Sequence, residues 1–222
     1  HNAGLDADDR KLVESLFDIF AYAGKVNQFL ITLVTSEFSK NAVTRDQILR
    51  GNSHLTNLFK VYYKRYGIRY YNSFFKNIIK YIDKNHQINL KQLDTCDIEA
   101  CTTVIFKVIN KVVHSSLHIP IEMRHLASIL RACAIHKFNS KQAAFNTLNG
   151  FFWLRFLSSM LANPSSVDPS IQLEHRDSLV AISKLLTRVF NLQTFDGNYE
   201  RFSVLNNEMN KVIFPQLINF IL

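Results

Sequence analysis

Apolar side chains recur at every third or fourth position along most of this chain, which is the spacing of helices that bury one face. The pattern predicts helices over residues 9–20, 26–38, 55–66, 70–83, 98–113, 120–134, 140–161, 176–193 and 199–221. Gly24 interrupts the first stretch, which forms two helices or one broken helix. Residues 163–175 contain proline and serine but few apolar side chains, so we expect one long loop there.

Several of these helices have recognisable ends. The expected starts are Asn52 or Ser53, Asp94 or Thr95, Pro120 as a first helical residue, and Ser140. Gly67 is placed to end the helix over residues 55–66. Pro215 is expected to bend the last helix.

Composition supports an all-α fold. Six glycines and four prolines in 222 residues leave few turns, which favours long helices over many short strands. The length suits one large domain or two small ones. A formal net charge of +8 favours acidic partners, and nucleic acid, an anionic membrane and an acidic protein surface all fit it.

Other features concern the compartment. Cys96, Cys101 and Cys133 are odd in number and lack CxxC spacing, so a disulfide framework is not indicated and a reducing compartment is expected. No apolar run approaches the length of a membrane span, and the N-terminus lacks a hydrophobic signal core. We expect a domain cut from a larger protein, with residues 1–4 as a cloning remnant.

Familiar catalytic patterns are missing. The sequence has no phosphate-binding glycine loop, no HExxH and no GxSxG. His114 and His118 lie at helical spacing but lack a third ligand, so no metal site is expected. Any catalytic contribution would therefore be made in the active site of another protein.

Two arginines stand out. Arg50 precedes Gly51 and a predicted helix cap, where its guanidinium could project and bind phosphate oxygens, although the usual surface placement of arginine favours a solvated loop residue. Arg155 lies in the most apolar predicted helix, within Phe-Phe-Trp-Leu-Arg-Phe-Leu. A guanidinium there must form a structural ion pair, be hydrogen-bonded or emerge into a cleft.

Two motifs in the same order resemble Ras GTPase-activating protein domains. Ile48-Leu49-Arg50-Gly51-Asn52-Ser53, followed by Leu55 and Thr56, resembles the finger-loop motif of that family. Trp153-Leu154-Arg155-Phe156 is similar to its Phe-Leu-Arg-Phe motif. Weaker matches are Glu37, residues 119–124, and Ile182-Ser183-Lys184-Leu185-Leu186 with Asn191. Ser159-Met160-Leu161 departs from the family's Pro-Ala-Ile.

The resemblance implies an elongated all-α domain over residues 5–222, with helices around a central groove. It implies that Arg50 is an arginine finger and that Arg155 stabilises the finger loop. Further residues are implied to shape that loop or contact the partner: Gly51, Asn52, Ser53, Thr56, Lys184 and Asn191.

The implied partner is a GTP-bound Ras-family GTPase, which carries the GTP and Mg²⁺ itself. No cofactor or metal of its own and no stand-alone catalysis are expected. The resemblance further implies a cytoplasmic monomer that does not bind nucleic acid and reaches the inner face of a membrane only through its partner or further domains.

Two other functions stay open. A non-catalytic scaffold would bind GTP-loaded GTPase without accelerating hydrolysis, and the altered Ser159-Met160-Leu161 segment favours it. A nucleic-acid or anionic-membrane binder would use the basic helices over residues 54–84, in which tyrosines alternate with lysines and arginines.

Overall fold

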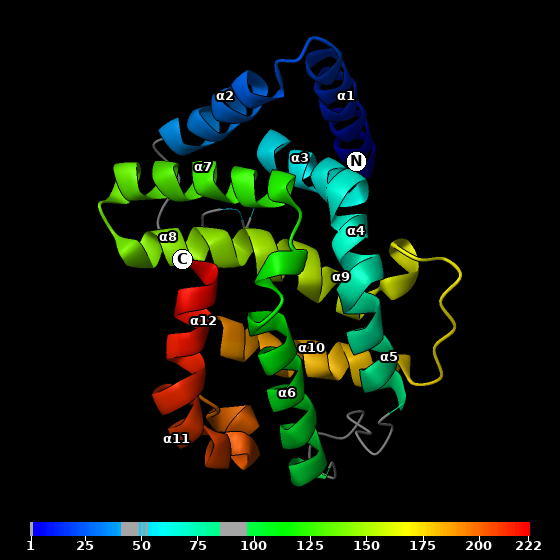
Figure 1. Cartoon of the computed structure of the whole chain (residues 1–222), viewed down its shortest axis with the longest axis vertical. Coiled ribbons are helices and arrows are strands. Elements are labelled where there is room, and N and C mark those ends of the chain that lie inside the picture. The colour runs from blue at the N-terminus through cyan, green and yellow to red at the C-terminus, as the bar shows by residue number, and fades with distance from the viewer. Residues whose placement is uncertain (1, 41–48, 50, 52, 85–96) are drawn as a thin grey trace. The chain divides into compact units, whose positions relative to one another are not determined.

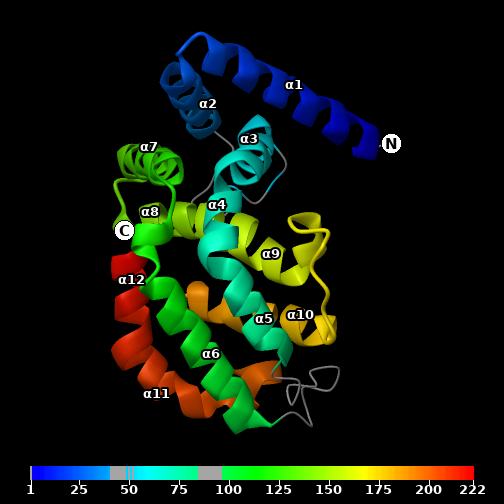
Figure 2. The ribbon, with the colours of Figure 1, turned by 45° about the vertical axis from the view of Figure 1, so that its right-hand side comes forward.

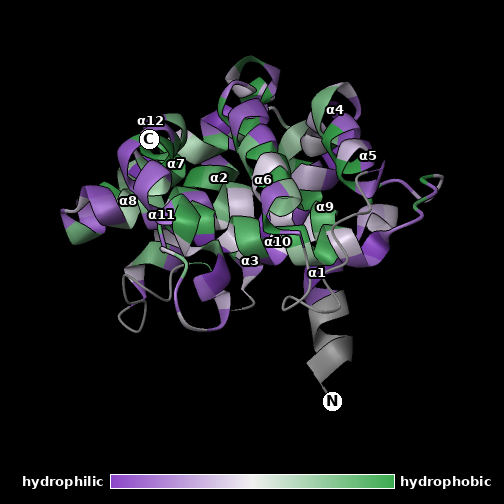
Figure 3. Ribbon diagram, turned by 90° about the horizontal axis from the view of Figure 1, so that it is seen from below, coloured by the Kyte–Doolittle hydropathy of each residue, from purple (hydrophilic) through white to green (hydrophobic). Residues whose placement is uncertain are grey.

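The computed structural model describes residues 2–40, 49, 51, 53–84 and 97–222 (Figure 1). Most of these residues are helical and no strand occurs among them, so the all-α prediction is confirmed. Most helices carry hydrophobic and hydrophilic residues on the same ribbon, as the periodicity predicts (Figure 3). Among the described residues, no helix has the length and apolarity needed to cross a membrane.

The chain divides into two compact units, and each is described separately. The first contains residues 1–68, 120–152 and 222, and the second contains residues 69–119 and 153–221.

The first unit contains four α-helices besides α3. They are α1 (Asn2–Tyr22), α2 (Val26–Ser39), α7 (Ile121–Phe138) and α8 (Lys141–Asn149). The short α3 (His54–Tyr62) packs against α1 and α2. Phe17 has no exposed surface and contacts the rings of Phe29 and Tyr62 edge-on, with centroids 6.4 and 5.7 Å away. These rings fix the angle between α1, α2 and α3.

The second unit is organised around α10 (Arg176–Phe190) (Figures 1 and 2). Packed against it are α5 (Lys76–Lys84), α6 (Ile98–Val113), α9 (Ser158–Ala162) and α12 (Phe214–Ile221). Four leucine and isoleucine side chains of α10 are fully buried: Leu179, Ile182, Leu185 and Leu186. The α10 helix is therefore the core of this unit.

Shorter helical segments connect these elements. The π-helical ones are Tyr63–Gly67, Tyr71–Phe75, Gly150–Leu157 and Met209–Ile213. The 3₁₀ ones are Ser116–His118, Pro164–Ser166 and Gly197–Leu205. Two three-residue α-helices complete the order, α4 (Ile68–Tyr70) and α11 (Asn206–Glu208).

Three of the predicted helix ends are confirmed. Gly24 has a φ of 67° between α1 and α2, where a left-handed residue ends the first helix. The side chains of Ser53 and Ser140 cap α3 and α8 as expected. Residues 163–175 form a loop with a single 3₁₀ turn.

Three predictions about helix ends were wrong. Gly67 does not end a helix, because helical structure continues through it from His54 to Lys84. The cap of α6 is Asp97, whose carboxylate accepts from the backbone N–H of Glu99 and Ala100, and not Asp94 or Thr95. Pro120 is the residue before the first turn of α7, one position earlier than predicted.

Candidate functional site

The finger-loop motif is anchored on both sides of Arg50. Arg50 itself and Asn52 lie outside the described residues. Leu49 is 4% exposed and has a φ of 61°, an uncommon conformation for a residue with a branched side chain. Gly51 is exposed, and a Cβ atom added to it would meet nothing within 4 Å. A buried leucine and an open glycine thus flank position 50.

The other end of the motif is closed by a capping box. The hydroxyl of Ser53 accepts from the N–H of Thr56 at 3.3 Å, and the N–H of Ser53 donates to the Thr56 hydroxyl at 2.8 Å. Each residue satisfies a backbone group that the helix start would leave unpaired. Thr56 is only 2% exposed. We therefore assign Thr56 to the cap and remove it from the predicted partner-contacting set.

The helix behind this cap is tied to Phe151. The hydroxyl of Tyr63, the residue after α3, donates to the carbonyl oxygen of Phe151. The rings of Phe59 and Phe151 meet at 4.8 Å, and those of Tyr63 and Phe151 at 5.5 Å. Phe151 lies four residues before Arg155 in the same segment. The cap of the finger-loop motif is therefore connected through α3 to Phe151.

The segment that carries Arg155 is π-helical over Gly150–Leu157. Such segments are rare and are frequent at functional sites, because the wider turn shifts the direction of the side chains. Trp153, Phe156 and Leu157 are buried, whereas Leu154 is 39% exposed. Arg155 is half-buried.

Ser159 begins the stretch that departs from the family pattern. Its hydroxyl donates to the carbonyl oxygens of Arg155 at 3.0 Å and Phe156 at 2.8 Å. A proline at this position would have neither this hydroxyl nor a backbone N–H. The serine therefore satisfies the carbonyl of Arg155 by a contact that the family residue could not make.

The Arg155 segment is also fastened to α10. Trp153 stacks on Phe190 with centroids 3.8 Å apart, and its indole N–H donates to the Thr187 hydroxyl at 3.1 Å. The hydroxyls of Ser158 and Ser183 are hydrogen-bonded at 3.1 Å. Ser183 and Thr187 flank Lys184, so these contacts hold the Arg155 segment against the helix that carries it.

The two remaining predicted site residues lie at the surface of the second unit. Lys184 is exposed on α10, and Asn191 is exposed at the C-terminal cap of the same helix. Both are available to a partner, as the prediction requires.

A latch that sequence reasoning missed holds residues 163–175. Asp168 accepts from the Lys76 ammonium at 2.5 Å and from the Ser170 hydroxyl at 2.6 Å. These two hydrogen bonds lower the pKa of the Asp168 carboxyl to about 2. Burial and the same carboxylate raise the pKa of Tyr71 to about 12.

A second latch lies where the loop enters α10. The buried Asp83 accepts from the backbone N–H of Glu174 at 3.1 Å and of His175 at 2.8 Å. Both latches join α5 to the approach to α10. The sequence pattern did not predict these contacts because the partners lie far apart in the chain, with 92 residues between Lys76 and Asp168.

Comparison with known proteins agrees with this geometry. Residues 91–191 match the family described as GTPase-activator protein for Ras-like GTPase. The matched stretch contains Arg155, Lys184 and Asn191, and the finger-loop motif lies before it.

The chain is also similar to the inhibitory regulator protein BUD2/CLA2 of Saccharomyces cerevisiae, with 22% identity over 240 aligned residues. This alignment covers 92% of the chain and 22% of the yeast protein, so the chain spans about a fifth of its relative's length. Residues 91–191 of this all-α chain therefore match the family of GTPase activators for Ras-like GTPases, and the chain is similar to a yeast inhibitory regulator protein.

Proposed function

We propose that this chain accelerates GTP hydrolysis by a Ras-family GTPase in its GTP-bound state, and that Arg50 enters the partner's active site. The observation that carries the proposal is the family match over residues 91–191, which includes the Arg155 segment. The buried Leu49 and the capped Ser53 support it, because they fix the backbone on both sides of Arg50.

The chemistry explains why an arginine would act in trans. The GTPase brings its own GTP and Mg²⁺, and negative charge develops on the phosphoryl oxygens during hydrolysis. A guanidinium that meets this charge stabilises the transition state more than the bound nucleotide. Arginine fingers of this class accelerate GTP hydrolysis by roughly 10³- to 10⁵-fold, and the range used here for Arg50 is the range of that class.

The other site residues would prepare the finger. Gly51 and Asn52 would shape the loop, Ser53 would cap it, and the carbonyl of Arg50 would orient the water-positioning glutamine of the GTPase. Arg155 would hold the loop by hydrogen bonds. Lys184 and Asn191, both exposed, would contact the switch regions of the partner.

The proposed setting follows the family. Residues 5–222 would act as a monomeric domain in the cytoplasm, with no cofactor or metal of their own. Without a partner, the chain would hydrolyse nothing.

Single-turnover GTP hydrolysis with a panel of Ras, Rap and related GTPases tests the proposal. The wild type should accelerate at least one of them, and Arg50→Ala should lose roughly 10³-fold or more of that acceleration. Arg50→Lys keeps the charge without the planar fork and should recover little of it. Binding to the GTP-loaded partner should change little in either variant. An Arg50→Ala variant that stimulates at the wild-type rate would refute the finger.

The same panel separates the non-catalytic scaffold. The scaffold predicts that the wild type binds a GTP-loaded GTPase but leaves its hydrolysis rate unchanged. Since Ser159 keeps the carbonyl of Arg155 hydrogen-bonded, the departure from the family pattern does not disrupt the segment that would support the finger. We therefore favour the catalytic activator.

A further inference from the structure

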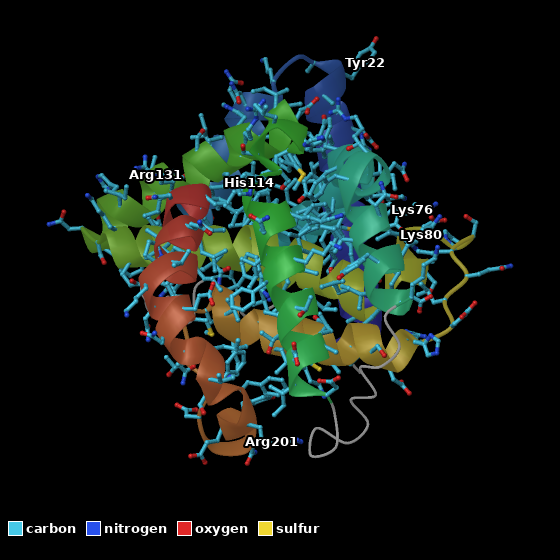
Figure 4. All side chains as sticks on the ribbon, turned by 60° about the horizontal axis from the view of Figure 1, so that its bottom comes forward. Tyr22, Lys76, Lys80, His114, Arg131 and Arg201 are labelled. Carbon is cyan, nitrogen blue, oxygen red and sulfur yellow. The ribbon has the colours of Figure 1, made fainter. Side chains whose placement is uncertain are left out.

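One face of the second unit combines two lysines of α6 with a tyrosine of α5. The ammonium of Lys107 on α6 lies 4.2 Å from the ring centroid of Tyr81 on α5, and that of Lys111 lies 5.9 Å from it. Helices α5 and α6 lie side by side in front of α10 (Figures 1 and 2). Lys80, one position before Tyr81, lies on the same side of α5 as Lys76 and away from α6, so it is not part of this face (Figure 4). We call Tyr81, Lys107 and Lys111 the basic face.

Within the described residues, no carboxylate pairs with these lysines. Asp83 of α5 is buried and accepts from the backbone at the start of α10. Glu99 of α6 lies in the first turn, two helical turns before Lys107.

Two neighbouring groups set the limits of the face. Glu208 of α11 lines a shallow cavity together with Lys107 but forms no ion pair with it. Lys76 is neutralised by Asp168, so it is left out of the face. The basic face therefore keeps its positive charge toward solvent.

The residues that follow on α6 indicate which anionic partner fits. Lys107, Lys111 and His114 are spaced four and three residues apart, which places them on one side of the helix (Figure 4 labels His114). Leu117, in the turn after α6, is 87% exposed. Lysines beside a tyrosine and an exposed leucine suit a bilayer interface, where the charges meet phosphates and the apolar side chain enters the acyl boundary. Nucleic acid would leave the leucine in water.

We propose that the basic face, with Leu117, binds the surface of an anionic phospholipid membrane directly. This binding does not depend on Arg50 or on any GTPase. It replaces the expectation from sequence that the chain reaches a membrane only through its partner or further domains. Membrane contact through this face would hold the chain where a lipid-bound partner is concentrated.

Co-sedimentation with phosphatidylcholine vesicles, with and without phosphatidylserine, tests the proposal. The wild type should bind the phosphatidylserine vesicles and release them as salt is raised. Lys107→Gln/Lys111→Gln should weaken the partition coefficient about 30-fold, because each lysine near an anionic surface contributes about fivefold. Leu117→Ser should weaken it further, without a change in net charge.

A matched pair on the first unit supplies the control. Lys25→Gln/Lys141→Gln removes the same charge from exposed lysines that form no ion pair with any residue the structure describes, and it should bind vesicles like the wild type. If both double variants lost vesicle binding equally, the loss would reflect net charge alone, and the basic face would not be the binding site. So would wild-type binding by Leu117→Ser, or tighter binding to a DNA duplex than to vesicles.

The failure of this proposal can be told from that of the GTPase proposal. In solution without vesicles, Lys107→Gln/Lys111→Gln should stimulate a soluble GTPase like the wild type.

Discussion

The hydroxyl of Tyr63 donates a hydrogen bond to the main-chain carbonyl of Phe151. Tyr63 follows the helix that the finger-loop motif caps, and Phe151 lies in the π-helical segment that continues to Arg155. A π segment changes its backbone hydrogen-bonding pattern, so a side-chain donor at its start helps fix where the segment begins. Within the first unit, this contact therefore fixes the end of α3 relative to the backbone at Phe151.

Removing that hydroxyl should affect catalysis more than folding. Tyr63→Phe keeps the rings of Phe59 and Phe151 packed and loses one hydrogen bond, whose net contribution to stability is about 1 kcal/mol. We expect a several-fold lower maximal rate of stimulated GTP hydrolysis, with little change in the concentration giving half-maximal stimulation. Single-turnover assays at saturating activator measure this maximal rate.

Tyr22→Phe is the matched control, because Tyr22 is 97% exposed. It should match the wild type in rate and melting temperature. If Tyr63→Phe stimulated at the full rate while losing stability, the contact would be structural only.

Gly51→Ala should separate folding from partner contact. A methyl group there meets nothing within 4 Å, and Gly51 is not among the glycines with positive φ, so stability should stay within about 0.5 kcal/mol of the wild type. If the GTPase approaches the backbone closely at this point, the methyl group should reduce stimulation at least tenfold. Thermal melts and hydrolysis assays on the same samples measure both effects.

Gly24→Ala provides the opposite pattern. Gly24 has a φ of 67°, where alanine is strained, so this variant should lose about 1 kcal/mol of stability and keep its activity. If Gly51→Ala stimulated GTP hydrolysis like the wild type, Gly51 would lie outside the surface that contacts the GTPase.

Local signals in the sequence predicted much of the fold. Ser53, Ser140 and Gly24 mark helix ends by side-chain capping or by a left-handed backbone, and these effects involve neighbouring residues only. Gly67 failed as a signal because it is buried inside a continuous helical run. Tertiary packing there outweighs the roughly 1 kcal/mol by which glycine disfavours a helix.

The candidate site was predictable only in part. Arg155 and Lys184 could be singled out because a charge in an apolar stretch and a motif are visible in one dimension. Tyr63 could not, because its partner lies 88 residues away and the contact depends on a main-chain carbonyl. Neither could the shift to π geometry over Gly150–Leu157, since the apolar pattern is nearly continuous there.

Thr187 should prove important for the Arg155 segment. Thr187→Val keeps the shape but removes the acceptor of the Trp153 indole N–H, and an unpaired buried donor costs about 1–3 kcal/mol. We expect lower stability and weaker stimulation together. Trp153 is the only tryptophan in the chain, so its fluorescence reports the change directly.

Thr103→Val, at an exposed position on α6, should change neither the fluorescence nor the activity. Unchanged emission in Thr187→Val would show that the indole N–H finds another acceptor.

The Asp168 latch should make stability depend on pH in the acid range. The pKa of Asp168 is about 2 in the folded chain, below the ordinary value of 3.8, so the ionised carboxylate stabilises the fold. This contribution is complete above about pH 4 and is lost as the pH falls toward about 2. The free energy of unfolding should therefore differ between wild type and Asp168→Asn at neutral pH and converge as the pH falls through this window. Urea denaturation at several pH values measures the difference, and Lys76→Gln should converge in the same window because it removes the other half of the pair. A difference that stays constant from about pH 6 down to about pH 2 would show that the latch does not depend on the charge of Asp168.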